Sequence, residues 1–127
     1  MERIQVRRSQ APKQGRLLSA IRTYLPGAWV SPAPQELISL YRLRYKMALE
    51  DEKYDAALIF LNKILEVDPM NSEAKLCLAE LYHRHLKDLG RAVEQYNKVI
   101  RLTAGRPSDR IHQRARTSLT EILELLS

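Results

Sequence analysis

One stretch of the sequence repeats itself at a shift of 35 residues. Residues 54–65 and 89–100 agree in identity or apolar character at eight positions. A period of 20–50 residues is typical of an array of stacked supersecondary units, because one such unit cannot bury its apolar face alone. The paired residues are Tyr54 with Leu89, Ala57 with Ala92, Leu58 with Val93, Leu61 with Tyr96, and Asn62-Lys63-Ile64-Leu65 with Asn97-Lys98-Val99-Ile100.

The spacing of apolar residues predicts helices in the repeated stretches, between them and on either side. Apolar residues recur at i, i+3 and i+4, which places them on one face of a helix. We expect helical segments with apolar positions from 37 to 49, 54 to 65, 74 to 82, 89 to 100 and 111 to 126. The expected boundary residues are Pro69 after the second segment, Asn71 or Ser72 before the third, Asp88 before the fourth, and Ser108 or Asp109 before the fifth.

Composition fits a helical globular domain and excludes several other classes. The apolar fraction of 45% and the charged fraction of 28% are ordinary for a soluble protein. The single cysteine, Cys77, cannot form an internal disulfide and is compatible with a reducing compartment. No run of about 18 apolar residues is present to cross a membrane. We therefore expect a cytoplasmic protein.

Charge divides the chain into two parts. Residues 1–33 hold six Lys and Arg against Glu2, a net charge of +5, whereas residues 34–127 hold fifteen against fourteen acids, a net charge of +1. We expect 1–33 to be a partly disordered basic arm with a Pro-rich linker, and 34–127 to be the helical repeat domain. Within the arm, Leu17, Leu18, Ile21, Tyr24 and Leu25 form a stripe at helical spacing.

The basic arm has four interpretations. Its charges can attract nucleic-acid phosphates, or an anionic membrane into which the apolar stripe inserts. It can also be an organelle-targeting sequence, since acids are nearly absent before Glu36. The fourth interpretation is a solubilising tail. The apolar stripe is also a candidate to close the N-terminal end of the repeat array.

The repeated segments carry a recognisable pattern of residue sizes. Tyr54 is followed three residues later by the small Ala57, four residues further on by the large Leu61, and then by Pro69 after the helix. This pattern resembles the second helix of a tetratricopeptide repeat, in which the small residue lets two helices approach closely. The second unit matches the same family at Leu78, Ala79, Tyr82, Ala92 and Tyr96.

The resemblance covers about two repeats, residues 38–103, and it implies a fold. That fold is all-α: antiparallel helical hairpins stacked in a right-handed array, with the last helix, 108–126, as a cap. Two departures stand out. Tyr45 occupies a position where the family has a small residue, and the turn at 83–91 is one residue longer than the family pattern.

The resemblance also implies a binding surface, because the first helices of such hairpins line a concave groove. A groove of mixed charge suits a peptide or a helix of a protein partner. Some relatives clamp a C-terminal carboxylate; Arg42, Arg110 and Arg114 supply charge for this, but the asparagines of that clamp are missing. The candidate groove residues are Arg42, Lys46, Glu73, Leu76, Glu80 and His83.

Catalytic and metal-binding patterns are weak in this sequence. It has no phosphate-binding glycine loop and no strand-based nucleophile turn. Glu80 and His83 share a helical face, but a zinc site needs about four ligands and no second such motif is present. We therefore expect no enzyme, metal or cofactor, and predict an adaptor, scaffold or assembly factor that binds a protein. The alternatives are a membrane or nucleic-acid tether through the arm, and a structural subunit that pairs, with itself or another chain, through an open edge of the array.

Overall fold

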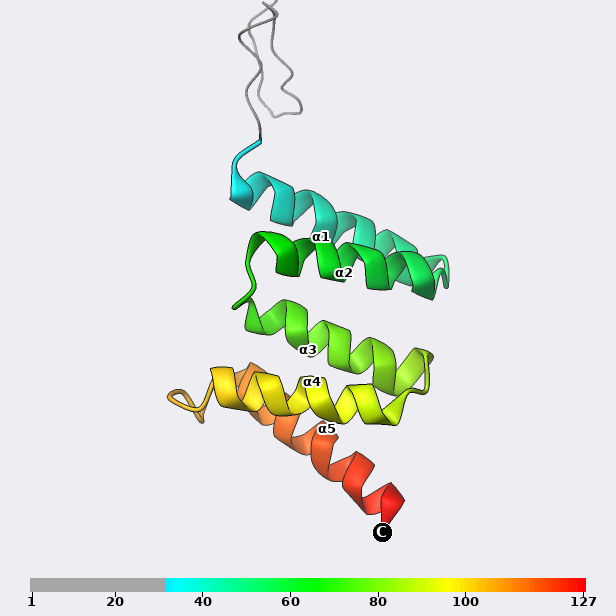
Figure 1. The fold of residues 1–127 in the computed structure, drawn as a ribbon, viewed down its shortest axis with the longest axis vertical. Coiled ribbons are helices and arrows are strands. Elements are labelled where there is room, and N and C mark those ends of the chain that lie inside the picture. The colour runs from blue at the N-terminus through cyan, green and yellow to red at the C-terminus, as the bar shows by residue number, and fades with distance from the viewer. Residues whose placement is uncertain (1–31) are drawn as a thin grey trace, which may run out of the picture. The chain divides into compact units, whose positions relative to one another are not determined.

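The computed structural model describes residues 32–127, and the regular elements of this part of the chain are all helices, joined by short connections (Figure 1). The predicted all-helical class is therefore confirmed for the described residues. Four of the five predicted segments lie within one helix, and residues 74–82 span two consecutive helical elements. The predictions for the basic arm concern residues outside this range. The elements are α1 (Pro34–Glu50), α2 (Tyr54–Val67), α3 (Ser72–Glu80) with the π-helical turn η2 (Leu81–His85) directly after it, α4 (Leu89–Leu102) and α5 (Arg110–Leu126).

The helices form two hairpins and a final helix. Helix α1 packs along α2, α3 with η2 packs along α4, and α5 packs on α4 and on α3 (Figure 1). Helices α2 and α4 are both 14 residues long and begin 35 residues apart, at positions 54 and 89. The sequence repeat is therefore also a repeat of structure.

Small residues lie where the helices of each hairpin meet. Ala57 and Ala92 have no exposed surface, and the large residues one turn later, Leu61 and Tyr96, are 1% and 0% exposed. The small side chains allow a close approach of the helices, and the large ones fill the space beside it. The two hairpins therefore build their cores in the same way.

Helix α3 and the first residue of η2 contribute to both hydrophobic cores of the domain. Ala74, Leu78 and Leu81 pack in the cluster of the first hairpin. Leu76 and Ala79 pack in a second cluster with residues of α4 and α5. Because these side chains leave the segment in two directions, it joins the hairpins into one folded unit.

Side-chain caps fix the beginnings of three helices. The Asn71 side chain accepts a hydrogen bond from the Ala74 N–H, and the Asp88 side chain accepts one from the Arg91 N–H. Asp109 accepts in the same way at the start of α5. These contacts satisfy amide groups that have no partner within the helix. They confirm the predicted boundaries at these residues.

Each hairpin turns through one residue with a left-handed backbone. Glu52 has φ of 58° and Lys87 has φ of 56°, and the two residues are 35 positions apart. After α1, the Lys53 N–H donates to the Ala48 carbonyl and the Glu52 N–H donates to the Leu49 carbonyl. This is the hydrogen-bond pattern of a Schellman motif, in which glycine is the usual residue.

The second hairpin has one residue more than the first between equivalent positions. This added residue lies in the helical turn η2 and not in the connection to α4. The Leu86 N–H donates to the Leu81 carbonyl at 3.0 Å, which widens the helix by one residue over η2. The expectation of a longer turn over 83–91 was wrong in its location, because the chain remains helical to His85. The connection between the helices is as short as in the first hairpin.

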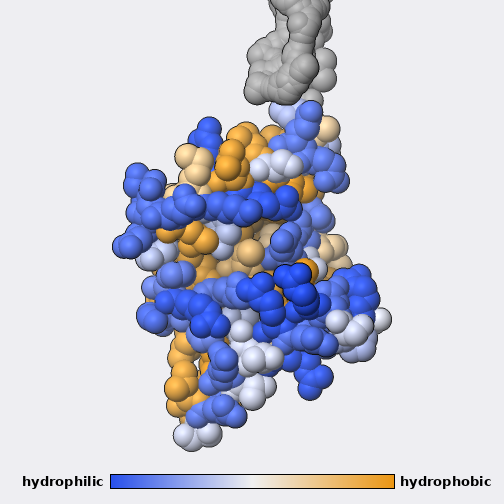
Figure 2. All heavy atoms as spheres, turned by 180° about the vertical axis from the view of Figure 1, so that it is seen from behind, coloured by the Kyte–Doolittle hydropathy of each residue, from blue (hydrophilic) through white to orange (hydrophobic). Residues whose placement is uncertain are grey.

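Apolar side chains reach the surface at both ends of the domain. Figure 2 shows such surface at the end of the domain formed by α1 and α2 and at the opposite end, over the last turns of α5. We call Leu40, Leu43 and Met47 the α1 stripe; they are 45%, 55% and 50% exposed and lie at i, i+3 and i+7. The exposed apolar residues of α5 are Leu123, Leu125 and Leu126.

Glycine at either left-handed turn position is expected to stabilise the domain. An L-residue is strained in this conformation, and glycine is not, although glycine adds entropy to the unfolded chain. We expect Glu52→Gly and Lys87→Gly each to raise the free energy of unfolding by about 0.5–1 kcal/mol, measured by urea denaturation. Asp51→Gly, in the same turn but without a positive φ, is the control. Equal effects at positions 51 and 52 would contradict the assignment.

Candidate partner-binding groove

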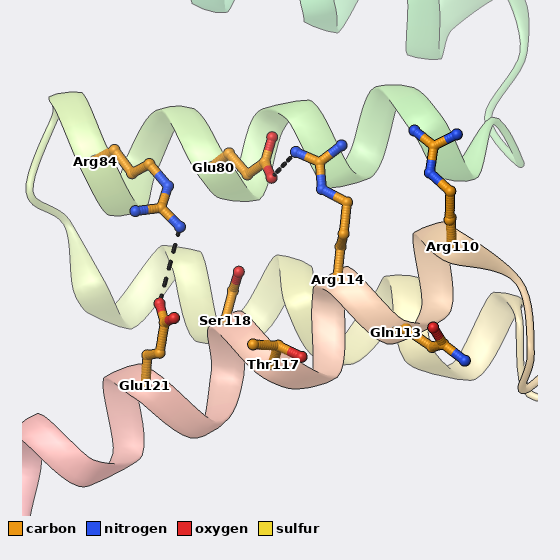
Figure 3. A pocket seen from close by; sticks show the side chains of 8 residues that line it. All are labelled: Glu80, Arg84, Arg110, Gln113, Arg114, Thr117, Ser118 and Glu121. Carbon is orange, nitrogen blue, oxygen red and sulfur yellow. Dashed lines mark hydrogen bonds and ion pairs between the residues drawn. The ribbon is translucent and has the colours of Figure 1, made fainter.

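A shallow groove of about 580 Å³ runs between the α3–η2 segment and α5 (Figure 3). Glu80 and Arg84 enter it from one side, and the remaining lining residues come from α5. They lie at i, i+3, i+4, i+7, i+8 and i+11 along α5, so they occupy one face of that helix. The α5 residues are Arg110, Gln113, Arg114, Thr117, Ser118 and Glu121.

Two ion pairs cross this groove. The Arg114 guanidinium pairs with the Glu80 carboxylate, and Arg84 Nη2 lies 3.8 Å from Glu121 Oε1 (Figure 3). Both members of the second pair are 53% exposed. Exposed ion pairs of this kind contribute only about 0.2–1 kcal/mol, so a partner's charges can replace them at low cost. Arg110 makes no ion pair with any residue of 32–127, and its charge is therefore available.

The predicted groove residues on α1 and at the start of α3 extend this charged surface. Lys46 is exposed, and Arg42 Nη2 lies 3.5 Å from Glu73 Oε1, which links α1 to α3. Glu73 and Glu80 are seven residues apart and therefore lie on the same side of α3. We use the name charged face for the surface formed by the pairs Arg42–Glu73, Glu80–Arg114 and Arg84–Glu121 with Lys46 and Arg110.

Of the six predicted groove residues, only Glu80 lines the groove between the α3–η2 segment and α5. Arg42, Lys46 and Glu73 belong to the charged face outside that lining, and two residues, Leu76 and His83, belong to neither. Leu76 is 2% exposed and packs in the second hydrophobic cluster, so its assignment to a binding surface was wrong. Leu76 packs with residues of α4 and α5. In an isolated hairpin this side of α3 would be open to solvent, but here α5 covers it. His83 is partly buried: its Nδ1 lies 3.0 Å from the Tyr96 hydroxyl, and the two rings meet edge to face.

The groove residues on α5 were mostly missed from the sequence. Arg110 and Arg114 were considered only as charges for a carboxylate clamp, and Arg42, the third residue of that set, instead pairs with Glu73. The spacing of Arg110, Arg114, Thr117 and Glu121 at i, i+4, i+7 and i+11 is the signal that marks a polar face on α5. The spacing alone does not show that the α3–η2 segment lies opposite this polar face of α5.

Tyr45 and Cys77 connect α1 to α3. Tyr45, which stands where a small residue was expected, and Cys77 both pack against the hydrophobic cluster of the first hairpin. Burial raises the pKa of the Tyr45 hydroxyl and also the pKa of the Cys77 thiol. Because a reactive cysteine needs a lowered pKa, Cys77 serves as a packing residue at this helix contact.

The described residues offer no evident metal site or membrane span. Within 32–127, no three His, Cys, Asp or Glu side chains come together as a metal site would require. Glu80 and His83, the pair singled out in the sequence, have separate partners in Arg114 and Tyr96. No helix in this part of the chain has the length and apolar character needed to span a bilayer.

Comparison of the chain with protein-family models, with curated protein sequences and with solved structures gives no match. The function is therefore inferred from the geometry of the groove and from the residues that form it.

Truncation of Leu76 is expected to destabilise the domain strongly. Removal of a fully buried leucine leaves a cavity, so Leu76→Ala should lower the free energy of unfolding by about 2–5 kcal/mol in urea denaturation. Lys46→Ala, on the exposed surface of α1, should change it by less than about 0.5 kcal/mol. A small effect of Leu76→Ala would mean that this side chain is accessible after all.

His83 is expected to make stability depend on pH. Burial, followed by the nearby Arg84, lowers the pKa of His83 below its ordinary value. As pH falls through about 6.5, the unfolded chain therefore binds a proton that the folded chain does not, and stability falls. Above that pH the residue is neutral in both states. His83→Gln should make the decrease between pH 7.5 and 5 shallower in urea denaturation; identical pH profiles for the two proteins would contradict this.

Proposed function

We propose that residues 34–127 form a protein-binding module of tetratricopeptide type, whose charged face binds a peptide or a helix of a protein partner. The observation that carries the proposal is the groove between the α3–η2 segment and α5, lined by charged side chains in two ion pairs, of which Arg84–Glu121 is exposed and Glu80–Arg114 is partly buried. The structural repeat of 35 residues supports it. So does the recurrence of a buried small residue followed by a buried large one, at Ala57 with Leu61 and at Ala92 with Tyr96.

The charged face is suited to binding without a large loss of conformational freedom. Its residues stand on helices whose opposite sides are packed in the two hydrophobic clusters. A preorganised surface loses little entropy on association, so weak polar contacts can still give useful affinity. We propose that the module acts through such association as an adaptor, scaffold or assembly factor and not through catalysis. Its location in the cytoplasm stays a prediction.

The charges in the groove favour a partner with acidic groups. Three arginines, Arg84, Arg110 and Arg114, face two glutamates, Glu80 and Glu121. Arg110 and Arg114 are four residues apart and therefore neighbours on one face of α5. Carboxylates of a bound peptide can pair with Arg110 directly and with Arg114 by replacing Glu80. Guanidinium groups bind carboxylates through two parallel hydrogen bonds, which also fixes the orientation of the ligand.

Charge reversal of Arg110 is expected to prevent partner binding. The full chain, immobilised, would be incubated with extract from the source cells, and the retained proteins quantified by mass spectrometry. A partner held by the groove should be retained by the unmodified protein and reduced at least about tenfold by Arg110→Glu, because an attraction to a carboxylate becomes a repulsion. Arg101→Glu, on the exposed surface of α4 outside the groove lining, is the matched control.

The ion pair between Glu80 and Arg114 allows a second control for folding. Glu80→Arg combined with Arg114→Glu exchanges the two charges and retains the pair, so the stability of the domain should remain close to that of the unmodified protein. The charge pattern offered to a partner is inverted at both positions. Loss of the captured protein with unchanged unfolding would support the groove as the binding site. Retention of the same protein by both Arg110→Glu and the exchanged pair would contradict it.

A further inference from the structure

Each end helix of the domain carries an apolar stripe that stays largely exposed within residues 32–127. One is the α1 stripe, and we call Leu119, Leu123 and Leu126 the α5 stripe; they lie at i, i+4 and i+7. Leu123 and Leu126 are 51% and 64% exposed, and Leu119 is partly buried against the second hydrophobic cluster. Figure 2 shows apolar surface at both ends of the domain. Apolar residues at such spacings form the seam along which one helix packs on another.

The structural repeat shows what kind of cover the α1 stripe fits. Because η2 contains one residue more than an α-helical turn, positions before it correspond to α1 at a shift of 34. The residues equivalent to Leu40 and Met47 are then Ala74 and Leu81, and both are buried in the cluster of the first hairpin. Helix α2, which runs antiparallel to α3, packs along α3 there (Figure 1). A helix that covers the α1 stripe in the same way therefore runs antiparallel to α1.

The two stripes have the same spacing when they are read in opposite directions. Along α1 the apolar positions rise by three residues and then by four, and along α5 they fall by three and then by four from Leu126. Within one molecule α2, α3 and α4 separate α1 from α5, so the two stripes can meet only between copies (Figure 1). The antiparallel register pairs Leu40 with Leu126, Leu43 with Leu123, and Met47 with Leu119.

The charges beside the stripes are complementary in this register. Arg44 and Glu124 each directly follow the central leucine of their stripe, so in an antiparallel pair they lie on the same side of the contact. Arg116, one turn before the α5 stripe, approaches Glu50 and Asp51 at the end of α1. All five residues are exposed, and none forms an ion pair with another residue of 32–127. Their charges therefore have no competing partner there.

Symmetric contacts between two copies have the opposite charge pattern. If two α1 stripes pair in antiparallel fashion, Arg44 approaches Arg44 of the second copy. If two α5 stripes pair, Glu124 approaches Glu124 of the second copy. Like charges across a contact disfavour it, whereas the pairing of Arg44 with Glu124 is attractive. Charge therefore favours a contact between unlike ends of the domain.

We propose that the α5 stripe of one copy binds the α1 stripe of a second copy in antiparallel orientation, so that the helical arrays join end to end. A contact between unlike surfaces leaves one stripe open at each end of the pair, so further copies can add. One helix from each copy makes only a small interface, and we expect a dissociation constant of about 10–1000 μM. The α5 stripe lies opposite Arg110, Arg114 and Thr117 on α5, so the proposal does not depend on the partner-binding groove.

Sedimentation velocity of the full chain from about 10 μM to 1 mM tests this proposal. The average sedimentation coefficient should rise with concentration and should not level off at a dimer. Leu43→Lys and Leu123→Lys each place a charge at the centre of one stripe, so each variant alone should remain a monomer. Their equal mixture should form a dimer and nothing larger, because each variant retains the stripe that the other has lost. Ile59→Lys, at a residue of α2 that is also 55% exposed, is the control and should associate like the unmodified protein.

The same variants distinguish the other possible contacts. A dimer that persists in Leu123→Lys and is lost in Leu43→Lys would show paired α1 stripes, and the reverse would show paired α5 stripes. Either result would overturn the proposal, as would an unmodified protein that is monomeric at every concentration. So would a mixture of the two variants that stays monomeric while urea denaturation shows both to be folded.

A charge exchange tests the contact without a change in the apolar residues. Arg44→Glu and Glu124→Arg should each weaken the association at least about tenfold, because each creates a pair of like charges. The double variant restores a pair of opposite charges and should associate like the unmodified protein. Failure of this restoration, with folding unchanged in urea denaturation, would contradict the proposed register.

Discussion

The burial of the α3–η2 segment on two sides is the constraint on which the rest of this domain depends. A single helical hairpin has too little apolar surface to be stable, so each hairpin needs a neighbour. Ala74, Leu78 and Leu81 bury one side against the first hairpin, while Leu76 and Ala79 bury another against α4 and α5. The remaining side faces solvent, and it carries the acids Glu73 and Glu80. The charged face therefore lies on the side of α3 that neither hydrophobic cluster covers.

The sequence predicts the helices and their boundaries well because these depend on local interactions. Apolar spacing identifies all five α-helices, and Asn71, Asp88 and Asp109 cap helices where short polar side chains are favoured. Pro69 lies in the connection between α2 and α3. The repeat of 35 residues also identifies which positions are equivalent, so the burial of Ala57 and Ala92 follows directly from the pattern.

The candidate site was predicted less well because it depends on which helices meet. Leu76 was assigned to the surface, and only the position of α5 over α3 explains its burial. Thr103 and His112 are polar and buried, which their residue types do not indicate. The Thr103 hydroxyl gives its only hydrogen to the Val99 carbonyl, so the His112 Nδ1–H donates to Thr103, at 2.8 Å. This chain of hydrogen bonds attaches α5 to the end of α4.

The wide turn of η2 lets the two hairpins share one kind of connection although the second has one residue more. In a regular α-helix, an added residue would turn every side chain after it by about 100°. Here the Leu86 N–H donates to the Leu81 carbonyl, five residues back, so the wide turn takes up the added residue. Lys87 therefore keeps the left-handed turn position that Glu52 has in the first hairpin. The exposed connection, which is the part of a helical hairpin most open to proteolytic cleavage, stays as short as in the first hairpin.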